Sequence, residues 1–262
     1  MSLTPVLFLF LCHLGIGIVL TLLFVPGAAG VRFFRFTSAL AFILIVLGIA
    51  SRPSAVAFTR DARGIASAGL LVALLALSFV VAPWNPWRRP LLWLSAAGGL
   101  LTLAAEASAA PGAIPLVLTL ASFLTSAVLL GSSFTAMVLG HWYLVLPTMD
   151  VSHLQSIVKF HLGSTVARAS AVFAVGWAAA SAWDSALAPS FRSYVFSVDG
   201  IFLWQRSLFG LIGPAVLGYM TWETAKLRST QSATGILYVD LFMVIVGEVV
   251  AKYLLLATGM AF

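Results

Sequence analysis

Long apolar runs alternate with short polar breaks along this chain. Eight runs approach or exceed the roughly 20 residues that an α-helix needs to cross a bilayer at 1.5 Å per residue. In chain order they form spans one to eight, at residues 5–25, 34–50, 64–82, 91–110, 114–146, 151–183, 200–226 and 233–262. The pattern predicts an all-α, polytopic helical membrane bundle with about eight transmembrane helices, in a single integral membrane domain over residues 1–262.

Composition narrows the class of protein. Hydrophobic residues make up 61% of the chain and charged residues 8%, whereas soluble domains are about a quarter charged. The net charge of +6 comes from bases in separate loops, so it indicates no nucleic-acid partner. The first apolar run lacks the basic start of a signal peptide, and we expect it to remain as a helix.

The distribution of basic residues predicts an orientation. An even number of spans places both termini on one side. The loops after spans one, three and seven carry Arg32, Arg35, Arg88, Arg89, Lys226 and Arg228, and the opposite loops carry Arg52, Arg60, Arg63 and Arg192. The richer set favours the cytoplasm, which predicts periplasmic termini and the inner (cytoplasmic) membrane of a bacterium.

Histidines gather where spans five and six meet. Three of the four fall in this hairpin, as His141, His153 and His161, and titratable groups at membrane depth indicate a site. An imidazole titrates near neutral pH and can exchange protons with a quinone. We therefore predict a quinone site in the hairpin, with His141 or His161 at the headgroup and Trp142 and Tyr143 in the pocket wall. An interfacial turn is the alternative, and it suits His153 best.

Charged groups also share one face of the last span. Asp240, Glu248 and Lys252 are spaced at multiples of four residues, so they should point into the protein and away from lipid. Glu248 is a candidate proton relay; alternatively, Glu248 and Lys252 form a structural pair. Arg168 on span six requires an anion, either Glu106, Glu248 or an anionic group of a bound cofactor.

A haem b would need two imidazoles at similar depth. By helical rise, His161 lies roughly 15 Å and His13 roughly 17 Å from the cytoplasmic side, so these two are the candidate iron ligands if a haem is present. His141 and His153 are shallower and could instead hold a ligand or metal between the two adjacent helices. The single cysteine, Cys12, excludes an iron–sulfur cluster held by this chain alone, and a partner would carry any such cluster.

The last span carries a pattern found in a known family. Gly247-Glu248-x-x-x-Lys252-Tyr253, together with eight spans, resembles the membrane-anchor subunits of the polysulfide reductase and dimethyl sulfoxide reductase family. The resemblance implies an eight-helix, quinol-interacting subunit without haem that exchanges electrons with an iron–sulfur partner. His141-Trp142-Tyr143 matches no hallmark of that family, so the resemblance does not place the quinone site.

These observations predict a membrane subunit of a respiratory or photosynthetic electron-transfer complex. It would interact with quinone, and with haem b if the histidines ligate iron, as a non-catalytic or quinone-reactive subunit of an oxidoreductase. Its partners would be membrane lipid and other subunits, such as an iron–sulfur or cytochrome protein. The alternatives are a multi-pass transporter or permease, for which the break Gly210-x-x-Gly213-Pro214 is the candidate interruption, and a non-catalytic scaffold subunit.

Overall fold

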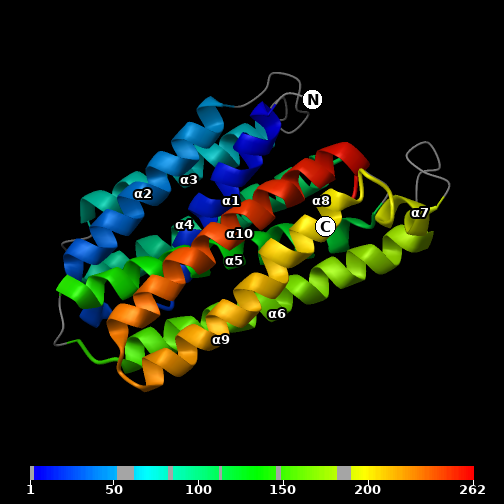
Figure 1. Cartoon of the computed structure of the whole chain (residues 1–262). Helices are drawn as coiled ribbons and strands as arrows, with labels where there is room; N and C mark the ends of the chain where they lie inside the picture. Colours follow the sequence, from blue (N-terminus) through cyan, green and yellow to red (C-terminus); the bar gives the residue numbers. More distant parts are fainter. Residues whose placement is uncertain (1–2, 52–61, 82–84, 112–113, 146–148, 182–189) are drawn as a thin grey trace.

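The computed structural model describes residues 3–51, 62–81, 85–111, 114–145, 149–181 and 190–262, and all regular secondary structure in them is helical. Figure 1 shows long helices lying side by side, with α2 and α3 on one flank and α6 and α9 on the other. In chain order the α-helices are α1 Thr4–Leu22, α2 Gly30–Ala50, α3 Ala62–Val81, α4 Asn85–Ala109, α5 Leu116–Val145, α6 Ser152–Ser181, α7 Phe191–Val195, α8 Ile201–Ser207, α9 Gly213–Lys226 and α10 Thr230–Thr258. A 3₁₀ turn, η1 (Gly27–Ala29), precedes α2, and a π-helical segment, η3 (Leu208–Ile212), joins α8 to α9.

The helices agree with an all-α membrane bundle, but fewer than eight qualify as spans by length and hydropathy. Six described segments are long and apolar enough to cross a membrane, namely Thr4–Leu22, Gly27–Ala50, Pro86–Ala109, Leu116–Val145, Ile201–Lys226 and Thr230–Thr258. α6 has sufficient length at 30 residues, but residues such as Lys159 and Arg168 lower its hydropathy. Within α3, the described apolar stretch Gly69–Ser78 is short.

α5 is the central helix, because it packs against α1, α4, α6 and α10. Glycines allow its closest approach to α1: a Cβ on Gly17 would lie 1.8 Å from the Ala127 carbonyl oxygen, and one on Gly131 would lie 2.0 Å from Gly17. Such close backbone contact is typical of membrane helix pairs. It holds the polar side chains of α5 in the middle of the bundle.

The candidate interruption in span seven is a change of helix type within one continuous helical segment, Ile201–Lys226. The helix changes to π geometry at η3. Gly210 in this segment lies against Gly247 of α10, and a Cβ added to Gly247 would come within 2.2 Å of the Gly210 Cα. π-Helical segments leave backbone groups with altered partners and often occur at functional sites. Here the segment brings the preceding turn, which carries Arg206, close to α10.

The inward orientation of the last span is confirmed. Asp240 and Glu248 have no exposed surface, and Lys252 is 3% exposed. α10 ends at Gly259, whose left-handed backbone (φ of 70°) turns the chain back into the bundle. Two of the residues used to predict the orientation, Arg52 and Arg60, lie outside the described residues, as does the side chain of Arg63.

Candidate functional site

Polar side chains leave α5 at three depths. Ser122 and Ser126 lie nearest its start, Ser132 and Ser133 lie near its middle, and His141 lies near its end. At 1.5 Å per residue these levels are about 9 to 12 Å apart. Each level contributes to a different site.

The first level is an ion cluster centred on Glu248. Arg168 Nε and Arg206 Nη2 each lie 2.9 Å from Glu248 Oε1, and Lys252 Nζ lies 3.5 Å from Oε2. Ser126 Oγ donates to Oε2 at 2.5 Å. We call these five residues, drawn from α5, α6, α8 and α10, the Glu248 cluster.

Three cations surround one carboxylate in this cluster, so positive charge is in excess. Arg168 has additional acceptors, since its Nη1 donates to Ser122 Oγ at 2.7 Å and its Nη2 to the main-chain oxygen of Phe262 at 2.8 Å. Arg206 is less well satisfied, because its Nε and Nη1 have no partner among the described residues. Glu248 is therefore the shared counter-ion of Arg168, Arg206 and Lys252. It is one of the anions that the sequence predicted for Arg168.

The cluster extends towards α1 and α4. Ser126 Oγ lies 3.3 Å from His13 Nδ1, and His13 Nε2 lies 3.1 Å from Glu106 Oε2. Lys252 Nζ donates to the same Ser126 oxygen at 2.6 Å. Glu106 is only 3% exposed, so it is part of the buried network and does not reach the interface.

The second level is the Asp240 cluster, which consists of Asp240, His161, Ser132, Ser133 and Ser164. His161 Nε2 lies 3.1 Å from Asp240 Oδ2, and its Nδ1 lies 3.1 Å from Ser132 Oγ. Ser133 Oγ donates to the same carboxylate at 2.7 Å, and Ser132 and Ser164 share a 2.8 Å bond. The cluster is buried and lies about two helical turns along α10 from Glu248.

The histidine environments do not suit haem ligation. Both ring nitrogens of His13 and both of His161 already have hydrogen-bond partners on the protein. A ligating imidazole must present one free nitrogen to the iron. Among the described residues there is also no group of three His, Cys, Asp or Glu side chains that could hold a metal ion. As arranged, His13 and His161 do not fit a pair of axial ligands.

The third level is a groove between α2, α5 and α10, which we call the lateral groove. Its volume is about 400 Å³, and its lining residues are Phe36, Leu40, Phe134, Met137, Val138, His141, Trp142 and Tyr238. Its polar end is a pair in which His141 Nδ1 and Tyr238 Oη lie 3.2 Å apart. The indole nitrogen of Trp142 is buried and has no hydrogen-bond partner among the described residues.

The predicted hairpin residues separate into different environments. His141 and Trp142 line the lateral groove, whereas His161 belongs to the Asp240 cluster and Arg168 to the Glu248 cluster. Tyr143 was predicted in the pocket wall, but its hydroxyl donates to the Asp150 carbonyl and accepts from the Leu154 N–H at 3.3 Å. Tyr143 therefore fastens the hairpin. The structure therefore does not bring His141, His153 and His161 together at one place.

His153 lies in the first turn of α6, beside the cap of that helix. Asp150 accepts a hydrogen bond from the Ser152 N–H at 2.9 Å, and this bond keeps the pKa of Asp150 below its usual value. Gln155 reaches instead to the Ala225 carbonyl at 3.3 Å. The start of α6 is thus a structural connection to α9, and it brings His153 to none of the three sites.

Two functional candidates were missed from the sequence. Arg206 is an ionisable residue within span seven, and the rule that drew attention to Arg168 would have identified it. Tyr238 gave no such signal, because a tyrosine near a membrane interface is ordinary. Only the packing of α10 against α5 reveals its contact with His141.

No protein-family model matches this chain, and a search of curated proteins also finds no match.

Proposed function

We propose that this protein is the quinone-interacting membrane subunit of an electron-transfer complex, and that the lateral groove holds the quinone headgroup. The observation that carries the proposal is the combination of groove shape and polar groups. The groove has a volume of about 400 Å³ and mostly apolar walls, which include the ring of Trp142, and an imidazole and a phenol lie at its polar end. Small-molecule sites typically combine an apolar cavity with a few placed polar groups.

The three polar groups suit the two carbonyl oxygens of a quinone. The Trp142 N–H has no acceptor among the described residues, and leaving a buried donor unpaired is costly unless a ligand accepts its hydrogen bond. Tyr238 can donate its hydroxyl proton, and His141 can replace it through their 3.2 Å contact. A quinone supplies two-electron, two-proton chemistry when bound; the chain's part is to hold the headgroup and to move protons at these atoms.

The surroundings of the groove suit a ligand that arrives from the lipid. Phe36 is 53% exposed and Tyr238 47% exposed, so the groove opens at the side of the bundle. His141 lies four residues before the end of α5, or about 6 Å along the helix axis, which places the headgroup near the interface. An isoprenoid tail would then remain in the bilayer.

The proposal includes the arrangement in the membrane. α3 and α6 would cross beside the six more apolar segments, giving eight crossings in a bacterial inner membrane with both termini in the periplasm. The groove would then lie near the cytoplasmic face, where an iron–sulfur or cytochrome partner could exchange electrons with the quinone. The resemblance carried by Gly247, Glu248, Lys252 and Tyr253 supports the same class of subunit.

Binding of a short-chain quinone to the protein in lipid nanodiscs tests this proposal. Trp142→Phe keeps the aromatic wall and removes the N–H donor. Loss of one hydrogen bond, worth about 0.5–1.5 kcal/mol, should weaken binding roughly 2- to 13-fold. Trp177→Phe on the exposed face of α6, where Trp177 is 76% exposed, is the matched control and should leave binding unchanged. Equal affinity in wild type and Trp142→Phe would remove the groove as the headgroup site.

A transporter is the second candidate, favoured by the π-helical break η3 beside the Glu248 cluster. Interrupted helices next to buried charges are typical of substrate paths. This alternative predicts a solute flux in proteoliposomes that Arg206→Met abolishes and Trp142→Phe leaves intact. The quinone proposal predicts the opposite sensitivity, with quinone binding responding to Trp142→Phe.

A further inference from the structure

We infer that Glu106 and His13 form a proton-binding site that water reaches through a small cavity. This site lies at the opposite end of α5 and α10 from the lateral groove, and the inference does not depend on quinone binding. Glu106 has a buried carboxylate oxygen that finds no hydrogen-bond partner in the described segments. The class of ligand that we assign is a proton delivered by water.

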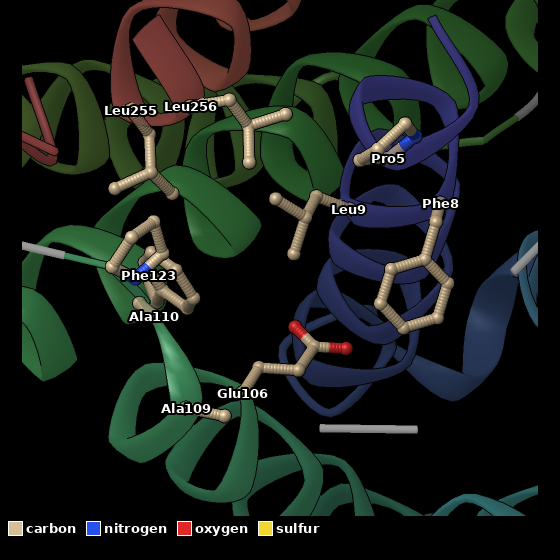
Figure 2. A pocket seen from close by; sticks show the side chains of 10 residues that line it. Pro5, Phe8, Leu9, Glu106, Ala109, Ala110, Phe123, Leu255 and Leu256 are labelled. Atoms are coloured by element: carbon tan, nitrogen blue, oxygen red, sulfur yellow. The ribbon is translucent and has the colours of Figure 1, made fainter. Parts of the chain in front are cut away.

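The cavity has a volume of about 40 Å³ and is bounded by α1, α4, α5 and α10. Figure 2 shows the Glu106 carboxylate extending from α4 towards Leu9 and Phe8 of α1, with Phe123, Leu255 and Leu256 around the same space. Oε1 of Glu106 is buried and has no hydrogen-bond partner among the described residues. A space of this size accommodates roughly one to three water molecules, which would supply that missing partner.

The hydrogen bonds of Ser126 determine which nitrogen of His13 carries a proton. A serine hydroxyl has one proton to donate and can accept two bonds. Ser126 donates to Glu248 and accepts from Lys252, so its remaining contact, with His13 Nδ1 at 3.3 Å, requires the imidazole to donate. His13 therefore carries a proton on Nδ1.

The proton on Nδ1 determines what the other ring nitrogen, Nε2, can bind. His13 Nε2 and Glu106 Oε2 lie 3.1 Å apart. If neither atom carried a proton, two acceptors would face each other without a bond. The pair therefore holds one proton, either on the carboxyl group or on the imidazole. In both arrangements the Glu106–His13 pair has no net charge.

The charges facing the pair explain why this proton can leave. Lys252 on α10 reaches Ser126, and behind it Arg168 on α6, Arg206 on α8 and Glu248 on α10 complete the cluster. Three cations and one carboxylate give a net charge of +2, counted from these ion pairs. Release of the proton to cavity water makes the pair −1 and partly neutralises that excess. Uptake is the reverse step: a hydronium ion gives a proton to the Glu106–His13 pair, which returns to zero net charge, and the hydronium ion becomes water.

Infrared difference spectroscopy of the reconstituted protein tests the inference, since a protonated carboxyl group has its own carbonyl band. We expect such a band to change with pH, to shift in D₂O, and to be lost in Glu106→Gln. Glu223→Gln is the matched control, because Glu223 is an exposed carboxylate paired with Lys226 at 2.7 Å, and it should retain the band. Ala110→Val, which narrows the cavity, should slow the shift in D₂O without removing the band.

Two results would overturn the inference. One is a Glu106→Gln spectrum identical to that of wild type, which would mean that Glu106 holds no titrating proton. The other is a band that D₂O does not shift, which would mean that water does not reach the carboxyl group. Should Glu106→Gln fail to fold, Glu106→Asp must move the band, and an unmoved band would likewise overturn the assignment.

Discussion

Replacing Glu248 by glutamine should destabilise this protein more than any other single loss of a carboxylate. The side chain keeps its size but loses the charge that Arg168, Arg206 and Lys252 share, at 2.9, 2.9 and 3.5 Å. Three buried cations would then face one another in the interior of the bundle. Removing one partner of a buried ion pair typically costs about 3–5 kcal/mol, because the other charge stays buried without compensation.

The loss of stability in Glu248→Gln should appear as a lower melting temperature. For chains of about 150–250 residues, 1 kcal/mol corresponds to a shift of roughly 2–4 °C. Glu248→Gln should therefore lower the Tm by roughly 6–20 °C, measured as loss of the monodisperse peak after heating in a fixed detergent. Glu223→Gln breaks an exposed pair with Lys226, worth about 0–1 kcal/mol, and its Tm should move by no more than roughly 4 °C.

A second substitution separates charge from packing. Lys252→Met in the Glu248→Gln background removes one of the unpaired cations while keeping an apolar side chain of similar length. Part of the lost stability should return. The reasoning fails if Glu248→Gln melts like Glu223→Gln, or if the double variant is as unstable as Glu248→Gln alone.

Two further predictions concern the arginines of the Glu248 cluster and the contact between α1 and α5. Arg206→Met should be neutral or stabilising in the melting assay, because two nitrogens of Arg206 have no partner in the described part of the chain. Arg168→Met should cost several degrees, because Arg168 also binds Ser122 and Phe262. Equal losses would contradict this difference. Gly17→Ala should abolish the monodisperse fraction, since its Cβ would lie 1.8 Å from the Ala127 carbonyl oxygen. Gly163→Ala is the control and should not, because no described neighbour lies within 4 Å of its Cβ. A well-folded Gly17→Ala protein would show that α1 and α5 are not so close.

Helix positions and the inward face of the last span could be predicted because they depend on local physics. A run of apolar residues of bilayer length forms a helix whatever its neighbours are. Charges spaced by four residues on such a helix share one side, which must avoid hydrocarbon. The buried positions of Asp240, Glu248 and Lys252 follow from these two rules alone.

The site could not be predicted in the same way, because adjacent residues on a helix point in directions about 100° apart. Trp142 therefore enters the lateral groove while Tyr143 turns to the hairpin connection. Polar residues that lie close together in the sequence therefore did not have to lie close together in the structure. The partners that complete each site, Tyr238 for His141 and Asp240 for His161, are 97 and 79 residues away, and helix packing alone brings them together.

Covalent mapping of a photoreactive quinone tests the proposed function most directly. The protein would be illuminated in nanodiscs with a quinone carrying the reactive group on its ring, and the modified residues would be identified by mass spectrometry. The account predicts labelling within residues 134–142 and at Tyr238, the lining of the lateral groove, and loss of the label when unlabelled quinone competes. Label that concentrates on α6 or α9, or that competitor does not reduce, would contradict it.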